Sequence, residues 1–196
     1  MTEQPLAGVR VLELSSYVAT PLCGLTLAQL GADVVRVEPP GGAPDRTRLP
    51  LAPSGTSYYW SGLNKGKRAV EIDLGSDDGR QAVADLAGGA DVVVANAPYR
   101  APVTAEALRE RYPALVHVRL TGTWTGTPAV DYTVQASAGF AGVTGPAGHD
   151  VPVNHVLPAW DVAAGLYLAT GALAALHRSR STGVGASITL ALEDVA

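Results

Sequence analysis

Residues 5–42 read PLAGVRVLELSSYVATPLCGLTLAQLGADVVRVEPPGG, and this stretch decides the fold. Gly8 to Leu14 is an apolar run of strand length, and Pro21 to Leu30 has the apolar spacing of a helix that Gly31 ends. Asp33 to Glu38 is a second run of strand length, which two prolines and two glycines then stop. A strand, a helix and a strand in this order indicate a parallel βαβ unit.

The same alternation continues along the chain. Further strands and helices are predicted at Arg68 to Leu74, Asp77 to Leu86 (capped by Ser76), Asp91 to Asn96, Ala105 to Tyr112 and Leu115 to Leu120. After Thr121 the rhythm breaks, with one predicted helix from Tyr132 to Gly142, and residues 186–196 are typical of a strand that enters a helix. We therefore expect one α/β domain over residues 1–196, a Rossmann-like, mainly parallel open sheet with helices on both faces.

Composition and charge disfavour several classes of protein. The net charge of −4 argues against a nucleic-acid surface, and no uncharged apolar run approaches the roughly 20 residues that cross a bilayer. The first residues lack the pattern of a secretory signal, so a cytoplasmic location is expected. A single cysteine, Cys23, excludes an internal disulfide and a thiolate metal cluster, and its apolar surroundings predict a small core residue.

The loops after the strands are the expected binding rim, because ligands of open α/β sheets lie beyond the carboxyl ends of the strands. No GxGxxG follows the first strand and no Walker A sequence occurs, which disfavours a nucleotide-dependent oxidoreductase. Between Gly41 and Gly66 the chain is long and polar, and it contains Tyr58, Tyr59 and Trp60. These aromatic side chains are either hydrophobic cover for the sheet edge or an interface, or the floor of an adenine or acyl site.

Asp161 is the candidate nucleophile, in the segment LPAWDVAAGLYLATG of residues 157–171. A carboxylate can attack a thioester carbonyl and accept the acyl group. Spacing alone favours the simpler interpretation that Asp161 is the N-cap of the apolar helix that follows Pro158. Both roles are compatible with one side chain.

Three further segments support a family resemblance: LNKGKRAVEIDL (63–74), ADVVVANA (90–97) and GTWTGTPAVDYTVQASAGFAGVTG (122–145). With residues 5–42 and the Asp161 segment, they resemble the family III CoA-transferases, the group of formyl-CoA transferase, carnitine CoA-transferase and α-methylacyl-CoA racemase. The resemblance runs from Pro5 to the last residue and covers only the N-terminal half of such enzymes.

The resemblance implies coenzyme A thioesters and carboxylic acids as substrates, no metal, and CoA transfer through an aspartyl anhydride and an aspartyl-CoA thioester on Asp161. It places CoA against Val18, Ala19, Ile72, Leu74, Gly75, Asn96, Ala97 and Pro98. The family's phosphate-binding arginine follows a longer loop, and Arg100 is the candidate to replace it. Asp131, Gln135 and Trp160 are expected to line the substrate site, with Trp160 excluding water from Asp161 and raising the pKa of that carboxyl.

The resemblance also bears on alternatives and partners. Racemase members carry a catalytic histidine where this chain has Val130, which disfavours a two-base racemization. Family III enzymes are interlocked homodimers of chains about twice this length, so a homo-oligomer or a complementary second-half chain is expected. A non-catalytic or regulatory half-protein that keeps the fold remains the alternative to a CoA-transferase.

Overall fold

A six-stranded sheet forms the centre of the molecule, with strand order β3-β2-β1-β4-β5-β6. The computed structural model describes residues 4–196. Every pair of neighbouring strands is parallel, which confirms the predicted α/β class. The strands are β1 (Arg10–Leu14), β2 (Asp33–Glu38), β3 (Arg68–Glu71), β4 (Val92–Ala95), β5 (Val116–Thr121) and β6 (Ser187–Ala191).

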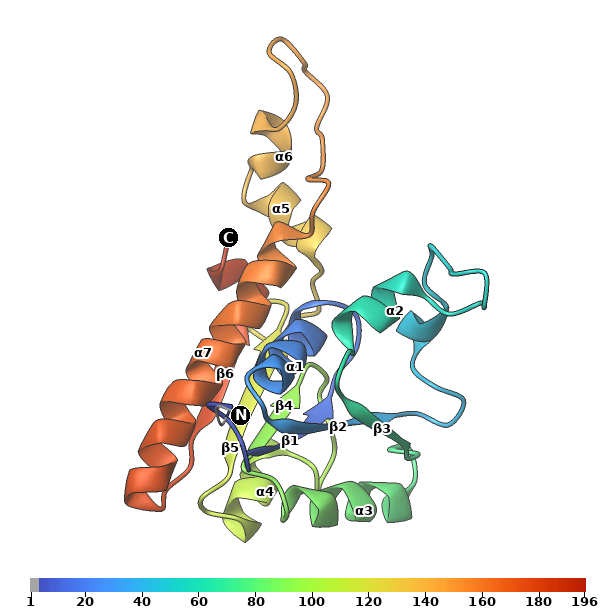
Figure 1. The fold of residues 1–196 in the computed structure, drawn as a ribbon. Helices are drawn as coiled ribbons and strands as arrows, with labels where there is room; N and C mark the ends of the chain where they lie inside the picture. Colours follow the sequence, from blue (N-terminus) through green and yellow to red (C-terminus); the bar gives the residue numbers. More distant parts are fainter. Residues whose placement is uncertain (1–3) are drawn as a thin grey trace.

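Helices cover both faces of this sheet (Figure 1). Helices α1 (Ala19–Gln29) and α7 (Ala159–Thr182) pack on one face, and α3 (Asp77–Ala87) and α4 (Ala105–Arg111) pack on the other. Strand β4 shows how a strand covered on both faces becomes apolar at every position. Val92 and Val94 belong to the core beneath α1 and α7, whereas Val93 and Ala95 belong to the core beneath α3 and α4.

The remaining elements lie at the carboxyl ends of the strands. They are η1 (Pro44–Thr47), α2 (Tyr58–Leu63), α5 (Asp131–Ser137), α6 (Phe140–Val143) and η2 (Leu192–Asp194). Helices α5 and α6 and residues 144–158, here called the arm, extend away from the sheet (Figure 1). The prediction of one helix from Tyr132 to Gly142 is wrong, because Gly139 adopts φ = 84° and breaks it in two. The final strand enters a 3₁₀ turn, η2, rather than the expected helix.

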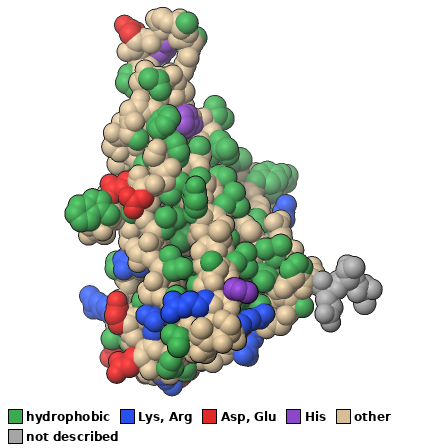
Figure 2. All heavy atoms as spheres, turned by 90° about the vertical axis from the view of Figure 1, so that its left-hand side faces the viewer, with side chains coloured by type: hydrophobic (Ala, Val, Ile, Leu, Met, Phe, Trp, Pro, Cys, Tyr) green, Lys and Arg blue, Asp and Glu red, His purple; other side chains and the backbone are tan. Residues whose placement is uncertain are grey.

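Helix α7 has the length and apolar composition of a membrane-crossing segment, at 24 residues. Its buried side chains, such as Leu168 and Ala172, belong to the core cluster that the sheet and α1 complete. The opposite side of α7 exposes Leu166 and Tyr167. Figure 2 shows hydrophobic side chains gathered over α7 and the arm.

Candidate active site

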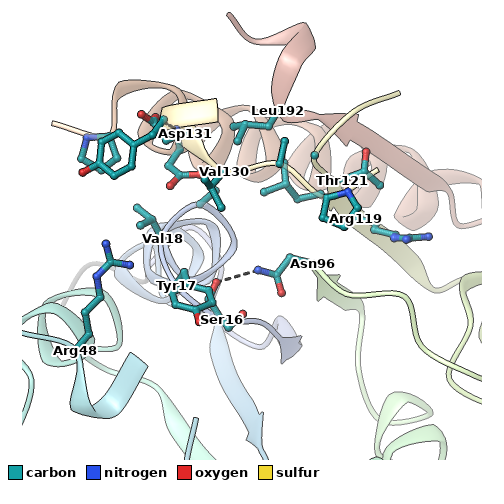
Figure 3. A pocket seen from close by; sticks show the side chains of 18 of the residues that line it. Ser16, Tyr17, Val18, Arg48, Asn96, Arg119, Thr121, Val130, Asp131 and Leu192 are labelled. Atoms are coloured by element: carbon teal, nitrogen blue, oxygen red, sulfur yellow. Dashed lines mark hydrogen bonds between the residues drawn. The ribbon is translucent and has the colours of Figure 1, made fainter. Parts of the chain in front are cut away.

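A cavity of about 620 Å³ opens at the carboxyl ends of β1, β4 and β5. Its walls come from the β1–α1 loop, Arg48 just after η1, α2, the loops after β4 and β5, the arm, α7 and η2. This is the place where a parallel sheet presents its ligand site, since loops from several strands meet there. The lining includes Tyr17, Val18, Ala19, Arg48, Tyr59, Asn96, Pro98, Val130, Asp131, Asp161 and Leu192 (Figure 3).

Asp161 lies in the first turn of α7 and lines this cavity. The alternative that Asp161 is the N-cap is wrong, because the N-cap is Pro158, which has no side chain to cap the helix. Asp131 performs that function from a distance: its Oδ2 accepts the N–H of Trp160 at 2.8 Å and that of Asp161 at 3.1 Å. Within residues 4–196, the Asp161 carboxylate itself has no hydrogen bond or ion pair to the protein. It is therefore available to react.

The surroundings of Asp161, including Asp131, make its carboxylate more basic. Burial, followed by the negative charge of Asp131, raises the pKa of Asp161 to about 6, while the positive charge of Arg48 opposes the shift. Asp131 is only 2% exposed, and its Oδ1 is buried without a partner among the described residues. A carboxylate with a pKa near 6 is more basic than an ordinary aspartate and is still mostly ionised at neutral pH.

The β1–α1 loop forms a second wall of the cavity. Tyr17 adopts φ = 65°, which is unusual for a residue with a side chain, and its N–H donates to Oδ2 of Asp45 at 3.1 Å. Asn96 Nδ2 donates to the carbonyl of Ser16 at 2.9 Å (Figure 3). These two bonds fix the loop from which α1 begins, so the positive end of the α1 dipole lies at the cavity.

A buried cluster of charges supports this loop from below. Arg36 is fully buried and forms ion pairs with Glu13 at 3.6 Å, with Glu38 at 2.9 Å and with Asp45 at 3.0 Å. Lys67 adds a second cation by donating to Glu13 at 3.0 Å. Asp45 thus connects the sheet to both Tyr17 and η1, the element that Arg48 follows.

A smaller cavity of about 240 Å³ adjoins the first, since Ser16 and Asn96 line both. Between them, the two cavities contain every residue predicted to contact CoA except Arg100. The larger contains Val18, Ala19, Asn96 and Pro98, and the smaller contains Ile72, Leu74, Gly75, Asn96 and Ala97. Arg100 is exposed and lines neither cavity.

Comparison with known proteins identifies the family. The sequence profile of CoA-transferase family III matches residues 6–196. The chain belongs to CoA-transferase family III. A CaiB/BaiF family protein from Brucella suis has a crystal structure that superimposes with a TM-score of 0.90 at 31% identity, over 99% of this chain and 55% of that one.

This family III chain is also similar in sequence to two curated enzymes that act on CoA thioesters. It is 44% identical to a 2-methylfumaryl-CoA isomerase of Chloroflexus aurantiacus, over 97% of this chain and 48% of the relative. It is 35% identical to a succinyl-CoA:mesaconate CoA-transferase of Haloarcula hispanica, over 96% of this chain and 52% of the relative. The chain therefore spans about half the length of the curated relatives it matches.

Two residues predicted to line the substrate site, Gln135 and Trp160, do not line the cavity. Gln135 is fully buried, and its Oε1 accepts the N–H of His155 at 3.1 Å, so it holds the arm together. The Trp160 ring packs on Phe140, with ring centroids 4.9 Å apart, and neither ring lines the cavity. The expected elevation of the Asp161 pKa is present, with burial as its main cause and the Asp131 charge as the second.

Arg48 and Arg119 are cavity residues that sequence reasoning missed. The Arg119 guanidinium points away from Val18, Arg48 and Asp131 in Figure 3, so Arg48 is the cation that faces the site. Tyr59 also lines the cavity, whereas Trp60 donates to Glu38 at 3.0 Å in the buried cluster. No local spacing distinguishes Arg48 from its neighbour Arg46, which is also paired with Glu38.

Two other titratable side chains, Cys23 and His117, are buried in the core. Cys23 is fully buried, as expected for a core residue, and burial raises the pKa of its thiol to about 12, so it is not a nucleophile. His117 is buried in β5, and burial lowers its pKa to about 4, which keeps the ring neutral. Residues 4–196 contain no group of three or more His, Cys, Asp and Glu side chains that could hold a metal ion.

Proposed function

We propose that this chain carries the acyl-accepting site of an acyl-CoA:carboxylate CoA-transferase, with Asp161 as the nucleophile. The observation that carries the proposal is the unpaired carboxylate of Asp161, which lines a cavity of about 620 Å³. The pKa of this carboxyl group is raised. Ordinary surface aspartates are less basic, and buried ones are usually paired. The family III match supports CoA transfer as the class of reaction.

The chemistry proceeds in balanced steps. A carboxylate oxygen of Asp161 attacks the thioester carbonyl, the C–S bond breaks, and CoA leaves as a thiolate from an acyl-aspartyl anhydride. The thiolate then attacks the aspartyl carbonyl and displaces the acyl group as a free carboxylate, which leaves an aspartyl-CoA thioester. An acceptor carboxylate repeats both steps in reverse. The positive end of the α1 dipole, at Val18 and Ala19, favours the oxyanion that each attack creates.

The substrates follow from the two cavities and the relatives. CoA extends along the residues of the smaller cavity, and the acyl group occupies the larger one beside Asp161. The names of both curated relatives contain dicarboxylic acyl groups, 2-methylfumaryl in one and succinyl and mesaconate in the other. We extend this class of acyl group to the present chain.

A partner is part of the proposal. The chain spans about half of its curated relatives, and Leu166, Tyr167, Val156 and Leu157 expose apolar surface on α7 and the arm beside the site. We propose that a second half, or a second copy of this chain, covers that surface and completes the enzyme.

Intact-mass measurement tests the chemistry directly. The chain is incubated with succinyl-CoA, alone and with a chain that supplies the second half, and hydroxylamine then traps the activated carboxyl group. A hydroxamate on Asp161 is expected in the wild type and in the control Asp150→Asn, which changes an exposed loop carboxylate. Asp161→Asn should give none. An equal yield of hydroxamate in Asp161→Asn would refute the assignment of the nucleophile.

A further inference from the structure

Arg48 is held at the cavity by aromatic rings rather than by carboxylates. Its guanidinium lies 4.4 Å from the ring centroid of Tyr59 and 5.8 Å from that of Tyr17. Within residues 4–196 this guanidinium makes no hydrogen bond and no ion pair to the protein. Stacking restrains an arginine without using its N–H donors, so these donors stay available to a ligand.

The lack of a carboxylate partner at Arg48 contrasts with two other arginines, one in β2 and one in η1. Arg36 and Arg46 are both paired with Glu38. Arg48 is near enough to Asp161 for its charge to lower the pKa of that carboxyl, yet the two side chains form no ion pair. The cavity therefore has a nucleophile and a separate, uncommitted cation.

The position of this cation is fixed by the buried cluster. Arg48 is the C-cap of η1, and its backbone N–H donates to the carbonyl of Asp45 at 3.3 Å. The side chain of Asp45 accepts two hydrogen bonds from Arg36, each at 3.0 Å, and one from the N–H of Tyr17. One buried aspartate thus sets both the start of the Arg48 side chain and one of the two rings that hold its guanidinium.

We propose that Arg48 binds the second, unactivated carboxylate of a dicarboxylic acyl group while Asp161 attacks the thioester carbonyl. The inference rests on the proposed function and goes further by naming the residue that selects the acyl group. A guanidinium binds a carboxylate through two parallel charge-assisted hydrogen bonds. An acyl group with a methyl end would instead place hydrocarbon against a charged group and leave its donors without partners.

CoA phosphates are the competing oxyanion for Arg48. Asp161 and Arg48 line the same cavity, and the thioester carbonyl must lie at Asp161 for the reaction to occur. The part of the substrate beside Arg48 is then the acyl group rather than the phosphates, for which the smaller cavity is the proposed route. Succinyl-CoA and butyryl-CoA distinguish whether Arg48 binds a CoA phosphate or the acyl carboxylate. They share the phosphates, and they differ only in that the acyl group ends in a carboxylate or in a methyl group.

Isothermal titration calorimetry with both thioesters measures how strongly the chain prefers succinyl-CoA to butyryl-CoA. The wild type is expected to bind succinyl-CoA about 10- to 100-fold more tightly than butyryl-CoA, the worth of a charge-assisted hydrogen-bonded pair. Arg48→Gln should remove this preference and leave the butyryl-CoA affinity within about 2-fold of the wild type. Arg48→Lys keeps the positive charge but loses the paired N–H donors of the guanidinium, so it should retain part of the preference for succinyl-CoA. Arg178→Gln, an exposed arginine in the last turns of α7, should behave as the wild type.

The other outcomes each have a meaning. Equal weakening of both thioesters in Arg48→Gln would show that Arg48 binds a CoA phosphate and would overturn the inference, as would an unchanged preference. A wild type that binds neither thioester, both alone and with a chain that supplies the second half, would overturn the proposed function itself. Arg48 is exposed, so its variants should fold, and thermal unfolding checks this.

Discussion

Asp161 and Asp131 lie side by side at the start of α7 but have different tasks. Asp131 uses Oδ2 to hold the backbone of the helix, whereas the Asp161 carboxylate stays unpaired within the described residues. Because the pKa of Asp161 is raised to about 6, its ionised, nucleophilic form is lost as the pH falls through that value. The rate of acyl transfer to Asp161 should therefore rise with pH, with a midpoint near 6, and level off above it.

The variant Asp131→Asn tests the cause of this midpoint. An asparagine keeps an oxygen that can accept the N–H groups of Trp160 and Asp161 but removes the negative charge that disfavours ionisation of Asp161. The midpoint should then move to lower pH, while α7 keeps its start. Hydroxamate yield from about pH 4.5 to about pH 8 gives both profiles. Superimposable profiles would show that Asp131 has no electrostatic effect on Asp161.

Between elements, the charge cluster around Arg36 connects β1, β2 and η1. Arg36→Leu removes a cation that faces three buried carboxylates, and breaking a buried network of this kind costs about 3–5 kcal/mol of stability. Arg68→Leu breaks an exposed pair with Asp33 and should cost less than about 1 kcal/mol. Urea unfolding of the two variants compares the costs, and similar values would contradict the assigned role of the cluster.

Helices α1 and α7 touch at a glycine. A Cβ on Gly165 would lie 2.6 Å from the carbonyl oxygen of Ala19 and 3.0 Å from Cβ of Leu22. Gly165→Ala should therefore push the helices apart, with a loss of about 1–3 kcal/mol and a lower yield of hydroxamate at Asp161, because Ala19 lines the cavity.

Gly171→Ala is the matched control in the same helix. Its Cβ would meet only Ile188, at an ordinary 3.5 Å, so it should stabilise the chain by up to about 1 kcal/mol through helix propensity. Thermal unfolding ranks the two variants. A Gly165→Ala protein as stable as Gly171→Ala would refute the close packing.

Local patterns explain how much of this arrangement could be predicted. Strand β2 was predicted to the residue, and Ser76 was predicted as a cap and accepts the N–H of Gly79, because both depend on neighbours in sequence. The bond from Asp131 to the start of α7 spans 29 residues, so no spacing rule indicates it. Arg48 was missed for the same reason: its role depends on Tyr59 and on a cavity that only the folded chain forms.

At the scale of the whole molecule, the main feature is the apolar surface over α7 and the arm (Figure 2). Tyr167, on α7, is 63% exposed there. If this surface meets a second copy or a second half, sedimentation velocity should show association that rises with concentration, and Tyr167→Glu should weaken it. Leu86→Glu, on α3 at the opposite face of the sheet, changes an exposed leucine and should have no effect. A monomer at every concentration, with or without a second-half chain, would contradict the proposed partner.

Because Asp131, 30 residues before Asp161, caps the start of α7, Asp161 cannot be moved into another protein with its properties by its own helix alone. The residues around Asp161 supply a helix, but the backbone N–H groups at its start are held by Asp131, and the elevated pKa depends partly on that same carboxylate. A designer who grafts residues 157–171 alone onto another scaffold would transfer a helix with an ordinary aspartate. The transferable unit must include both aspartates, the arm that joins them and the cavity walls that bury Asp161.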